Sequence, residues 1–370
     1  LVHTEDGAAS IGAFLTSPLD PFVDPVVQVR IFRQNSDILV VKIYHLVMDG
    51  GAANEYLYLL ADIYNRLKVV PDFKPAVNLT GSRSLRQVSR RFSLLRKAKI
   101  LRRSLRDLKC GGIYLLERIR FLAGGRKSSG RAWGLPLTQR SKENRTFIVR
   151  KIPAHLVKRL KDYAQSHGAT LNDAMLAAYF RAIHGLFAPE PEDSMRVRII
   201  SDLRRYLPGN RGEALCNLCA YVSINLGHYL GSSFMETLHC VRDRTISLKK
   251  DFMGLGIFPI SIAAKFIPFY LVNKLGRFEV DCIDRGYIRP VPKFSNIGEM
   301  ISNKLIFDKT PVSDAYQLGP VGYGPAFTVG IVGFEGSLTL SVGICDASWN
   351  GPVFNRLFDV MEREIARALM

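Results

Sequence analysis

The sequence predicts an α/β fold, because patterns typical of strands alternate with patterns typical of helices. Residues 37–44 form a strand pattern in which five residues are β-branched or apolar, and a short loop leads from it to a helical pattern that starts at Ala52. Residues 145–152 repeat this arrangement before a helix that starts at Pro153. The chain has 370 residues, 47% of them hydrophobic, which is enough for one large or two medium domains with their own cores.

The amino-terminal region is expected to form a hairpin followed by a helix. Prolines mark a loop over residues 18–25, and an apolar strand follows over residues 26–32. A turn at residues 33–36 would pair it with the strand over residues 37–44. In the next helix, apolar side chains recur three and four residues apart as far as Leu67.

The loop between that strand and helix is the main candidate site. His45 stands at the end of a buried strand, and Asp49, Gly50 and Gly51 follow it. Rigid scaffolds often hold reactive groups at strand ends. An unperturbed pKa of about 6.5 lets a histidine take and return a proton near neutral pH. The alternative, which spacing alone favours, is a core histidine whose ring bonds a backbone partner.

The H-x-x-x-D-G pattern of residues 45–50 resembles the catalytic signature of the chloramphenicol acetyltransferase-like superfamily. That group includes the condensation domains of nonribosomal peptide synthetases, plant acyltransferases and wax-ester synthases. Many members have a second histidine before the catalytic one, and here that position is Tyr44. The resemblance implies that His45 is the catalytic residue and that Asp49 orients the loop. Gly50 and Gly51 would let the backbone approach the substrate closely.

A strongly basic segment separates the two predicted halves of the chain. Residues 81–131 contain sixteen Lys and Arg against two acidic residues, within a net charge of +18. Residues 82–109 are expected to form one helix with a narrow apolar stripe. The stripe comprises Leu85, Val88, Phe92, Leu95, Ala98, Leu101, Leu105 and Leu108.

Three interpretations of this helix stay open. It can be a solvated crossover, a membrane-surface helix attracted to anionic lipids, or a contact with the phosphates of a coenzyme or carrier protein. Nucleic-acid binding is not expected, because only Phe92 among the aromatic residues lies between the charges. The expected units are residues 1–80, the crossover and linker 81–144, and a second lobe 145–370.

In the second unit, Thr170 and Asp173 are expected to cap a buried helix that runs to about Phe187. A strand over residues 196–201 leads into the sequence DLRRYLP of residues 202–208. This sequence is similar to a "DLRxYLP" region of condensation-like proteins, which is followed by an asparagine such as Asn217. The resemblance implies that Arg204 holds Asp49 as a structural partner of the histidine loop.

The segment of residues 294–299, FSNIGE, is similar to the "SN(I/V/L)G" segment of condensation-like and wax-ester-synthase-like acyltransferases. In that group the segment lines the channel near the catalytic histidine. Ser295 and Asn296 can exchange hydrogen bonds with a thioester or amide, and they are therefore candidates for steadying an oxyanion. The alternative is an Asx-type turn without a catalytic role.

The remaining predictions concern the carboxyl-terminal part and the cysteines. Residues 252–272 are apolar but carry two prolines and a lysine, so a bent, buried helical segment is expected rather than a membrane span. A hairpin is expected over residues 326–344 with its turn at 334–337, and a last helix over residues 352–369. The C-x-x-C of residues 216–219 is interpreted as small residues packed in a strand. With no framework spacing and no visible secretory signal, a reduced cytoplasmic setting is expected.

Together, these resemblances imply two chloramphenicol acetyltransferase-like lobes around a V-shaped cleft, with a truncated amino-terminal lobe. The implied reaction is acyl transfer from a thioester of coenzyme A or phosphopantetheine to an alcohol or amine. No permanently bound cofactor and no metal are expected. His45 would act as general base. One rival is an amide-forming enzyme that uses an acyl carrier protein as donor. Another is a catalytically silent relative that binds lipid or a membrane peripherally through residues 82–109.

Overall fold

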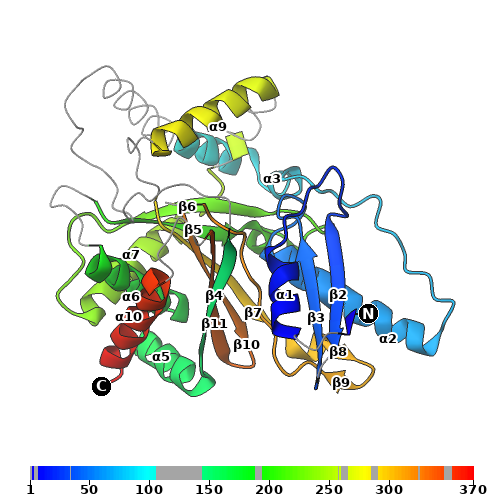
Figure 1. Cartoon of the computed structure of the whole chain (residues 1–370). Helices are drawn as coiled ribbons and strands as arrows, with labels where there is room; N and C mark the ends of the chain where they lie inside the picture. Colours follow the sequence, from blue (N-terminus) through cyan, green and yellow to red (C-terminus); the bar gives the residue numbers. More distant parts are fainter. Residues whose placement is uncertain are drawn as a thin grey trace.

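The computed structural model describes residues 2–3, 7–33, 35–105, 144–187, 194–256, 258–259, 266–284, 291–323, 326–345 and 352–370. Its larger part is built on a six-stranded mixed sheet (Figure 1). The strand order is β4 (Arg145–Ile152), β11 (Ser337–Cys345), β10 (Thr328–Phe334), β7 (Lys293–Met300), β5 (Arg196–Asp202) and β6 (Cys219–Asn225). Strand β7 runs parallel to both of its neighbours, and the other pairs are antiparallel. The predicted strand 145–152 and the predicted hairpin are therefore both confirmed.

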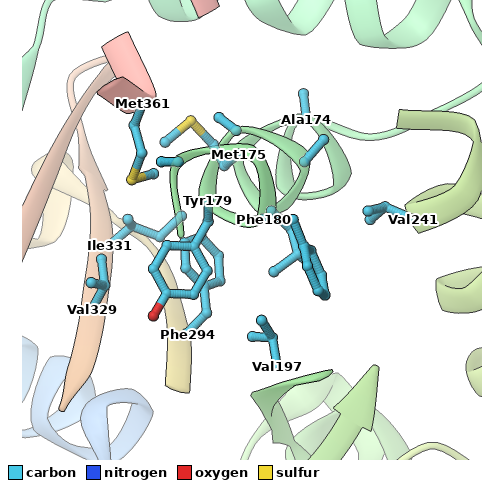
Figure 2. Packing of buried hydrophobic residues seen from close by; sticks show 14 of the residues in the cluster. Ala174, Met175, Tyr179, Phe180, Val197, Val241, Phe294, Val329, Ile331 and Met361 are labelled. Carbon is cyan, nitrogen blue, oxygen red and sulfur yellow. The ribbon is translucent and has the colours of Figure 1, made fainter. Parts of the chain in front are cut away.

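Helices α5 (Ala154–Ser166), α6 (Leu171–Leu186), α7 (Phe234–Lys250) and α10 (Pro352–Ala368) cover one face of this sheet (Figure 1). Helix α6 lies at the centre, and its small alanines let its neighbours approach closely. The predicted cap is present: Thr170 Oγ1 accepts from the Asp173 N–H, and the Asp173 carboxylate accepts from the Thr170 N–H. Figure 2 shows Tyr179 of α6 beside Phe294 of β7, with their ring centroids 5.1 Å apart.

The amino-terminal part has its own three-stranded sheet of β1 (Val2–His3), β2 (Val27–Arg33) and β3 (Asp37–Ile43). Strands β2 and β3 form the predicted antiparallel hairpin, with Val27 opposite Ile43 and Arg33 opposite Asp37. Helix α1 (Gly7–Thr16) packs Phe14 against Phe32 of β2. Helix α2 (Gly50–Val69) starts two residues before the expected Ala52, because Asp49 caps it.

Helix α2 is docked on the second part of the chain, through β7, η4 (Ser302–Lys304) and β8 (Ile306–Phe307), and β8 pairs with β9 (Thr310–Pro311). The Tyr58 hydroxyl accepts a hydrogen bond from the Ile301 N–H at 2.8 Å. Two turns further on, the Asn65 side chain donates to the Ile306 carbonyl and accepts from the Asp308 N–H, both at 2.8 Å. These contacts fix the direction of α2, and therefore the position of the loop at its start.

The expectation of a single basic helix over residues 82–109 is wrong. The chain forms the short helix α3 (Arg86–Ser89) and then a separate helical segment, residues 94–105, with a break near Ser93. Val88 and Phe92 of the expected stripe are buried, whereas Leu95, Leu101 and Leu105 are exposed. A change of direction at the break explains this, since one stripe can face the core continuously only along one straight helix. Leu108 and the predicted linker up to residue 144 lie mostly outside the described residues.

The expected buried segment over residues 252–272 is only partly correct. Met253 and Leu255 are buried, but Tyr270, Leu271 and Val272 are exposed at the start of α9 (Phe269–Asp284). Residues 257 and 260–265 lie outside the described residues. None of the described helices is both long and apolar enough to cross a membrane.

Candidate active site

His45 follows strand β3 in a turn closed by a hydrogen bond from the Val47 N–H to the Tyr44 carbonyl at 3.0 Å. Its side chain is exposed, and its Nδ1 lies 3.2 Å from the Met48 carbonyl oxygen. A carbonyl oxygen can only accept, so this contact assigns the proton of a neutral imidazole to Nδ1. Nε2 is then the nitrogen with a free lone pair, as a general base requires.

Tyr44, which occupies the position of the second histidine in many relatives, is half-buried. Its N–H donates to the Val26 carbonyl at 2.8 Å, which continues the β2–β3 pairing by one step. The residue therefore contributes to the site through its backbone, by holding the chain that enters the turn.

Asp49 is buried and uses both carboxylate oxygens for the surrounding backbone. Oδ1 accepts from the Ala52 N–H at 2.9 Å and caps α2, while Oδ2 accepts from the Leu218 N–H at 2.6 Å. The first bond holds the loop to its own helix. The second holds it to the chain just before β6, which belongs to the other part of the molecule.

Arg204 forms a bidentate ion pair with Asp49, in which Nη2 and Nη1 lie 2.9 and 3.0 Å from the two carboxylate oxygens. The structure thus brings together the two residues that the sequence resemblance paired. Arg204 lies in η1 (Leu203–Tyr206) and also donates to the Cys216 carbonyl at 2.9 Å and to Asp202 Oδ1 at 3.1 Å. All four Nη hydrogens therefore have acceptors. The guanidinium cannot shift without breaking one of these bonds.

Burial disfavours the charged form of Arg204, but the hydrogen bonds and charges of Asp49 and Asp202 prevail and raise the pKa of its guanidinium. A third acid, Glu55, places Oε1 3.5 Å from Arg204 Nε. Burial raises the pKa of the Glu55 carboxyl, although the charge of Arg204 opposes this shift. The cation is thus surrounded by three acids, of which Asp49 and Asp202 favour its charged form.

Two amides hold the same loop, and both come from the second part of the chain. Asn217 Nδ2 donates to the His45 carbonyl at 3.4 Å, and Gln317 Nε2 donates to the Gly50 carbonyl at 3.1 Å. Gln317 also bonds the side chain of Asn54, one turn into α2. The sequence contained no signal for Gln317, because its contact spans more than 260 residues and follows no periodic pattern.

Gly50 and Gly51 are the first two residues of α2 rather than a free loop. A Cβ at Gly50 would lie 3.0 Å from Ile297 Cγ2, and one at Gly51 would lie 3.0 Å from Arg204 Nη1. The two glycines therefore allow the start of α2 to approach β7 and the guanidinium. The close approach of backbone to substrate stays a prediction.

Ser295 and Asn296 lie on strand β7 and point to opposite faces of the sheet, as neighbours on a strand do. Asn296 Nδ2 donates to Asn172 Oδ1 of α6, and its Oδ1 accepts from the Gly298 N–H, both at 2.8 Å. The oxygen and the nitrogen of the Asn296 amide are therefore both hydrogen-bonded, on the face of the sheet that carries α6. Ser295 lies on the other face together with Ile297, whose side chain borders Gly50 at the start of α2.

Two thiols lie beside the buried charges. Cys219 begins β6, and its thiol donates to Asn217 Oδ1 at 3.0 Å. Burial raises the pKa of the Cys219 thiol to about 11, and the charges of Asp49 and Asp202 add to this shift. Burial also raises the pKa of Cys216. Both are unpaired and protonated near neutral pH, which suits packing and not nucleophilic or metal-binding chemistry. Among the described residues, no group of three His, Cys, Asp or Glu could hold a metal ion.

The arrangement of strands and helices is similar to that of domains from nonribosomal peptide synthetases and a polyketide synthase. Against the epimerization domain from the third module of tyrocidine synthetase B, the TM-score is 0.59 with 13% identity, covering 99% of this chain and 77% of that one. The first condensation domain of the CDA synthetase gives a TM-score of 0.59 with 15% identity, covering 99% and 74%. A structure described for condensation domain-mediated chain release from the enacyloxin polyketide synthase gives 0.51 with 14% identity, covering 93% and 60%.

No protein-family model and no curated protein matches this sequence. The likeness to the solved domains covers nearly the whole chain, although the identities are low. The chain therefore has the fold of these condensation-type domains, which confirms the fold expected from its motifs.

Proposed function

We propose that this protein transfers an acyl group from a thioester to an alcohol or amine, with His45 as the general base. The observation that supports this proposal most directly is the state of His45. Its Nδ1 is held by the Met48 carbonyl, and its exposed ring leaves Nε2 available. The loop that carries it is anchored through the buried Asp49–Arg204 pair. An exposed histidine ring contributes little packing to the fold, so a purely structural role does not explain why the loop that carries it is anchored so firmly.

In the proposed reaction, Nε2 takes the proton from the acceptor hydroxyl or amine as the acceptor oxygen or nitrogen attacks the thioester carbonyl carbon. The carbonyl oxygen becomes an oxyanion, to which the Ser295 hydroxyl can donate a hydrogen bond. When the carbon–sulfur bond breaks, the leaving sulfur takes the proton back from the imidazolium. The products are an ester or amide and a free thiol, and no covalent acyl-enzyme forms.

The donor in this proposal is a thioester of coenzyme A or of phosphopantetheine on an acyl carrier protein. The fold supports a donor of this kind, because the similar solved domains belong to carrier-dependent synthetases. The chain-release function named for the polyketide synthase neighbour gives a precedent for transfer away from a carrier. An alcohol acceptor is the main proposal. An amide-forming reaction with a carrier-bound donor is the second candidate and uses the same base.

The test is the release of free thiol from a panel of acyl-coenzyme A and acyl-phosphopantetheine donors, with alcohol and amine acceptors. His45→Ala should lower the acceptor-dependent rate about 10²–10⁴-fold, the usual contribution of general base catalysis. The thermal midpoint should stay close to that of the wild type, since an exposed side chain contributes little to folding. A fully active His45→Ala variant would exclude the proposed mechanism.

A catalytically silent relative is the remaining alternative, and the same panel separates it. If the wild type and His45→Ala release thiol at the same background rate with every donor, the protein is silent under this test. Lipid binding that persists in both would then favour a binding role. Replacement of Val69, an exposed residue at the far end of α2, by Ser is a matched control that should leave the rate unchanged.

A further inference from the structure

Residues 94–105 form a helical segment that turns an apolar side toward solvent. Leu94, Leu101 and Leu105 are separated by seven and four residues, so they lie on one side of the helix, which we call the leucine ridge. Their exposed fractions are 82%, 48% and 53%. Leucines repeated on one side of a helix normally mark the side that is buried. Here that side faces out.

The segment is firmly seated by its opposite side, so the exposure of the leucine ridge is not the result of a loose helix. Ile100 and Ser104 are buried, and the Ser104 hydroxyl donates to the Gly256 carbonyl at 2.8 Å. Arg103 forms an ion pair with Asp251 at 3.0 Å. These three residues, Ile100, Arg103 and Ser104, fix the orientation of the helix and therefore the direction of the leucines.

Exposed cations surround the leucine ridge. Lys97 and Arg102 lie on its two sides, Lys99 and Arg96 lie farther round the helix, and Arg91 precedes the segment. Residues 94–105 contain no acidic residue that could neutralise them. The combination of outward leucines with long cationic side chains on both flanks is the pattern of a helix that lies in a lipid interface, where the charges reach the headgroups and the leucines enter the acyl region.

Helix α9 adds exposed aromatic side chains at the same end of the molecule, although its sequence carries Glu279, Asp281 and Asp284 beside two cations (Figure 1). Phe266, just before it, is 84% exposed, and Tyr270 and Phe278 are also exposed. Lys274 and Arg277 lie exposed on the same helix. Aromatic side chains with an apolar body and nearby cations favour the boundary between lipid tails and headgroups.

We propose that residues 94–105, assisted by α9, dock this protein on an anionic lipid surface. The occupant is a membrane, because the leucine ridge stands on the outside of a helix and carries cations along both flanks. A flat anionic interface meets all of these groups at once, and each Lys or Arg near it adds attraction to the headgroups. This inference is independent of the transfer reaction and would stand if His45 proved inactive.

The test is cosedimentation of the full chain with phosphatidylcholine vesicles and with vesicles that also contain 30% phosphatidylserine. Binding is expected only to the anionic vesicles and should weaken as salt rises. Leu94→Ser/Leu101→Ser/Leu105→Ser should weaken it by about tenfold per leucine. Arg96→Gln/Lys97→Gln/Lys99→Gln should weaken it by about fivefold per charge. Circular dichroism would verify that each variant is folded.

Two control variants separate docking at this surface from general attraction to a protein of net charge +18. Lys158→Gln/Lys161→Gln/Arg244→Gln removes three exposed cations from α5 and α7, and Val69→Ser/Val70→Ser removes apolar groups from the end of α2. Both should bind as the wild type does. Equal losses in the controls and in the ridge variants would overturn the proposal. So would an absence of vesicle binding, with or without binding of an acidic carrier protein to the ridge.

Discussion

The carboxylate of Asp49 and the guanidinium of Arg204 form a buried, bidentate ion pair between residues 155 positions apart in the sequence. The pair joins the start of α2 to the chain that leaves β5. Both partners also form hydrogen bonds with the backbone. The pair therefore holds the histidine loop in one position.

The first prediction concerns this pair. Asp49→Asn keeps the shape and the cap of α2 but leaves the Arg204 charge without its bidentate partner. Removing one partner of a buried pair costs about 3–5 kcal/mol, and the free energy of unfolding in urea should fall by that amount. Asp49→Asn/Arg204→Met should lose less than the sum of the two single variants, because no buried charge is left unpaired.

The matched control for that prediction is the Arg33–Asp37 pair, which has a similar distance of 2.9 Å but is about half exposed. Asp37→Asn should change the free energy of unfolding by less than about 1 kcal/mol. If Asp49→Asn cost no more than Asp37→Asn, burial would not be what makes the site pair strong.

The second prediction concerns Gly51. An alanine Cβ there would lie 3.0 Å from Arg204 Nη1 and 3.3 Å from Asp202 Oδ2. Arg204 cannot move away, so Gly51→Ala should lower the free energy of unfolding by about 1–3 kcal/mol. Gly12→Ala in α1 meets nothing within 4 Å and should raise it by about 0.5–1 kcal/mol. Thermal unfolding of both variants would show whether the signs differ as expected.

The third prediction concerns the contact between α2 and the second part of the chain. Asn65→Ala removes both hydrogen bonds to residues 306 and 308 and leaves the backbone groups without that partner. The expected loss is about 1–3 kcal/mol in the free energy of unfolding. Asn273→Ala, at an exposed position in α9, should stay within about 0.5 kcal/mol. Similar losses in both variants would mean that the docking bonds contribute no specific stability.

The fourth prediction is a pH dependence. Burial raises the pKa of Cys219 from 9.0 to about 11, so the folded protein holds this thiol protonated more strongly than the unfolded chain does. The stability that results is fully present below pH 9 and is lost as the pH rises through about 11. At pH 8 only about 0.1% of Cys219 is thiolate in the folded state. Mass spectrometry after brief iodoacetamide treatment should find Cys219 unmodified at pH 8 and labelled in urea. Rapid labelling of the folded protein at pH 8 would contradict this shift.

Local patterns in the sequence predicted the regular elements well. Strand β4 has the predicted bounds because its apolar run is closed by Pro153, which cannot continue the ladder. Helix α6 was predictable from the Thr170–Asp173 cap, whose partners are three residues apart. In both cases the physical cause lies within a few residues, and the sequence displays it directly.

Local patterns could not predict which face of a helix or strand meets the rest of the protein. Periodicity shows that Leu101 and Leu105 share a side of a helix, but not whether that side meets the core or solvent. In the same way, alternation separates Ser295 from Asn296 without showing which one turns toward α2. The contact of Arg204 with Asp49 came from resemblance alone, since no local pattern links residues so distant in sequence.

The long sequence separation within the anchoring pair also bears on how the protein is made. A nascent chain can close its β2–β3 hairpin early, but His45 reaches its final setting only after residues 202–218 have left the ribosome and β5 and β6 have paired. Until then the histidine turn has neither its ion pair nor its bond from Leu218. Assembly of the reactive loop therefore follows the pairing of β5 with β6, and its bond from Gln317 can form only once residue 317 has also emerged.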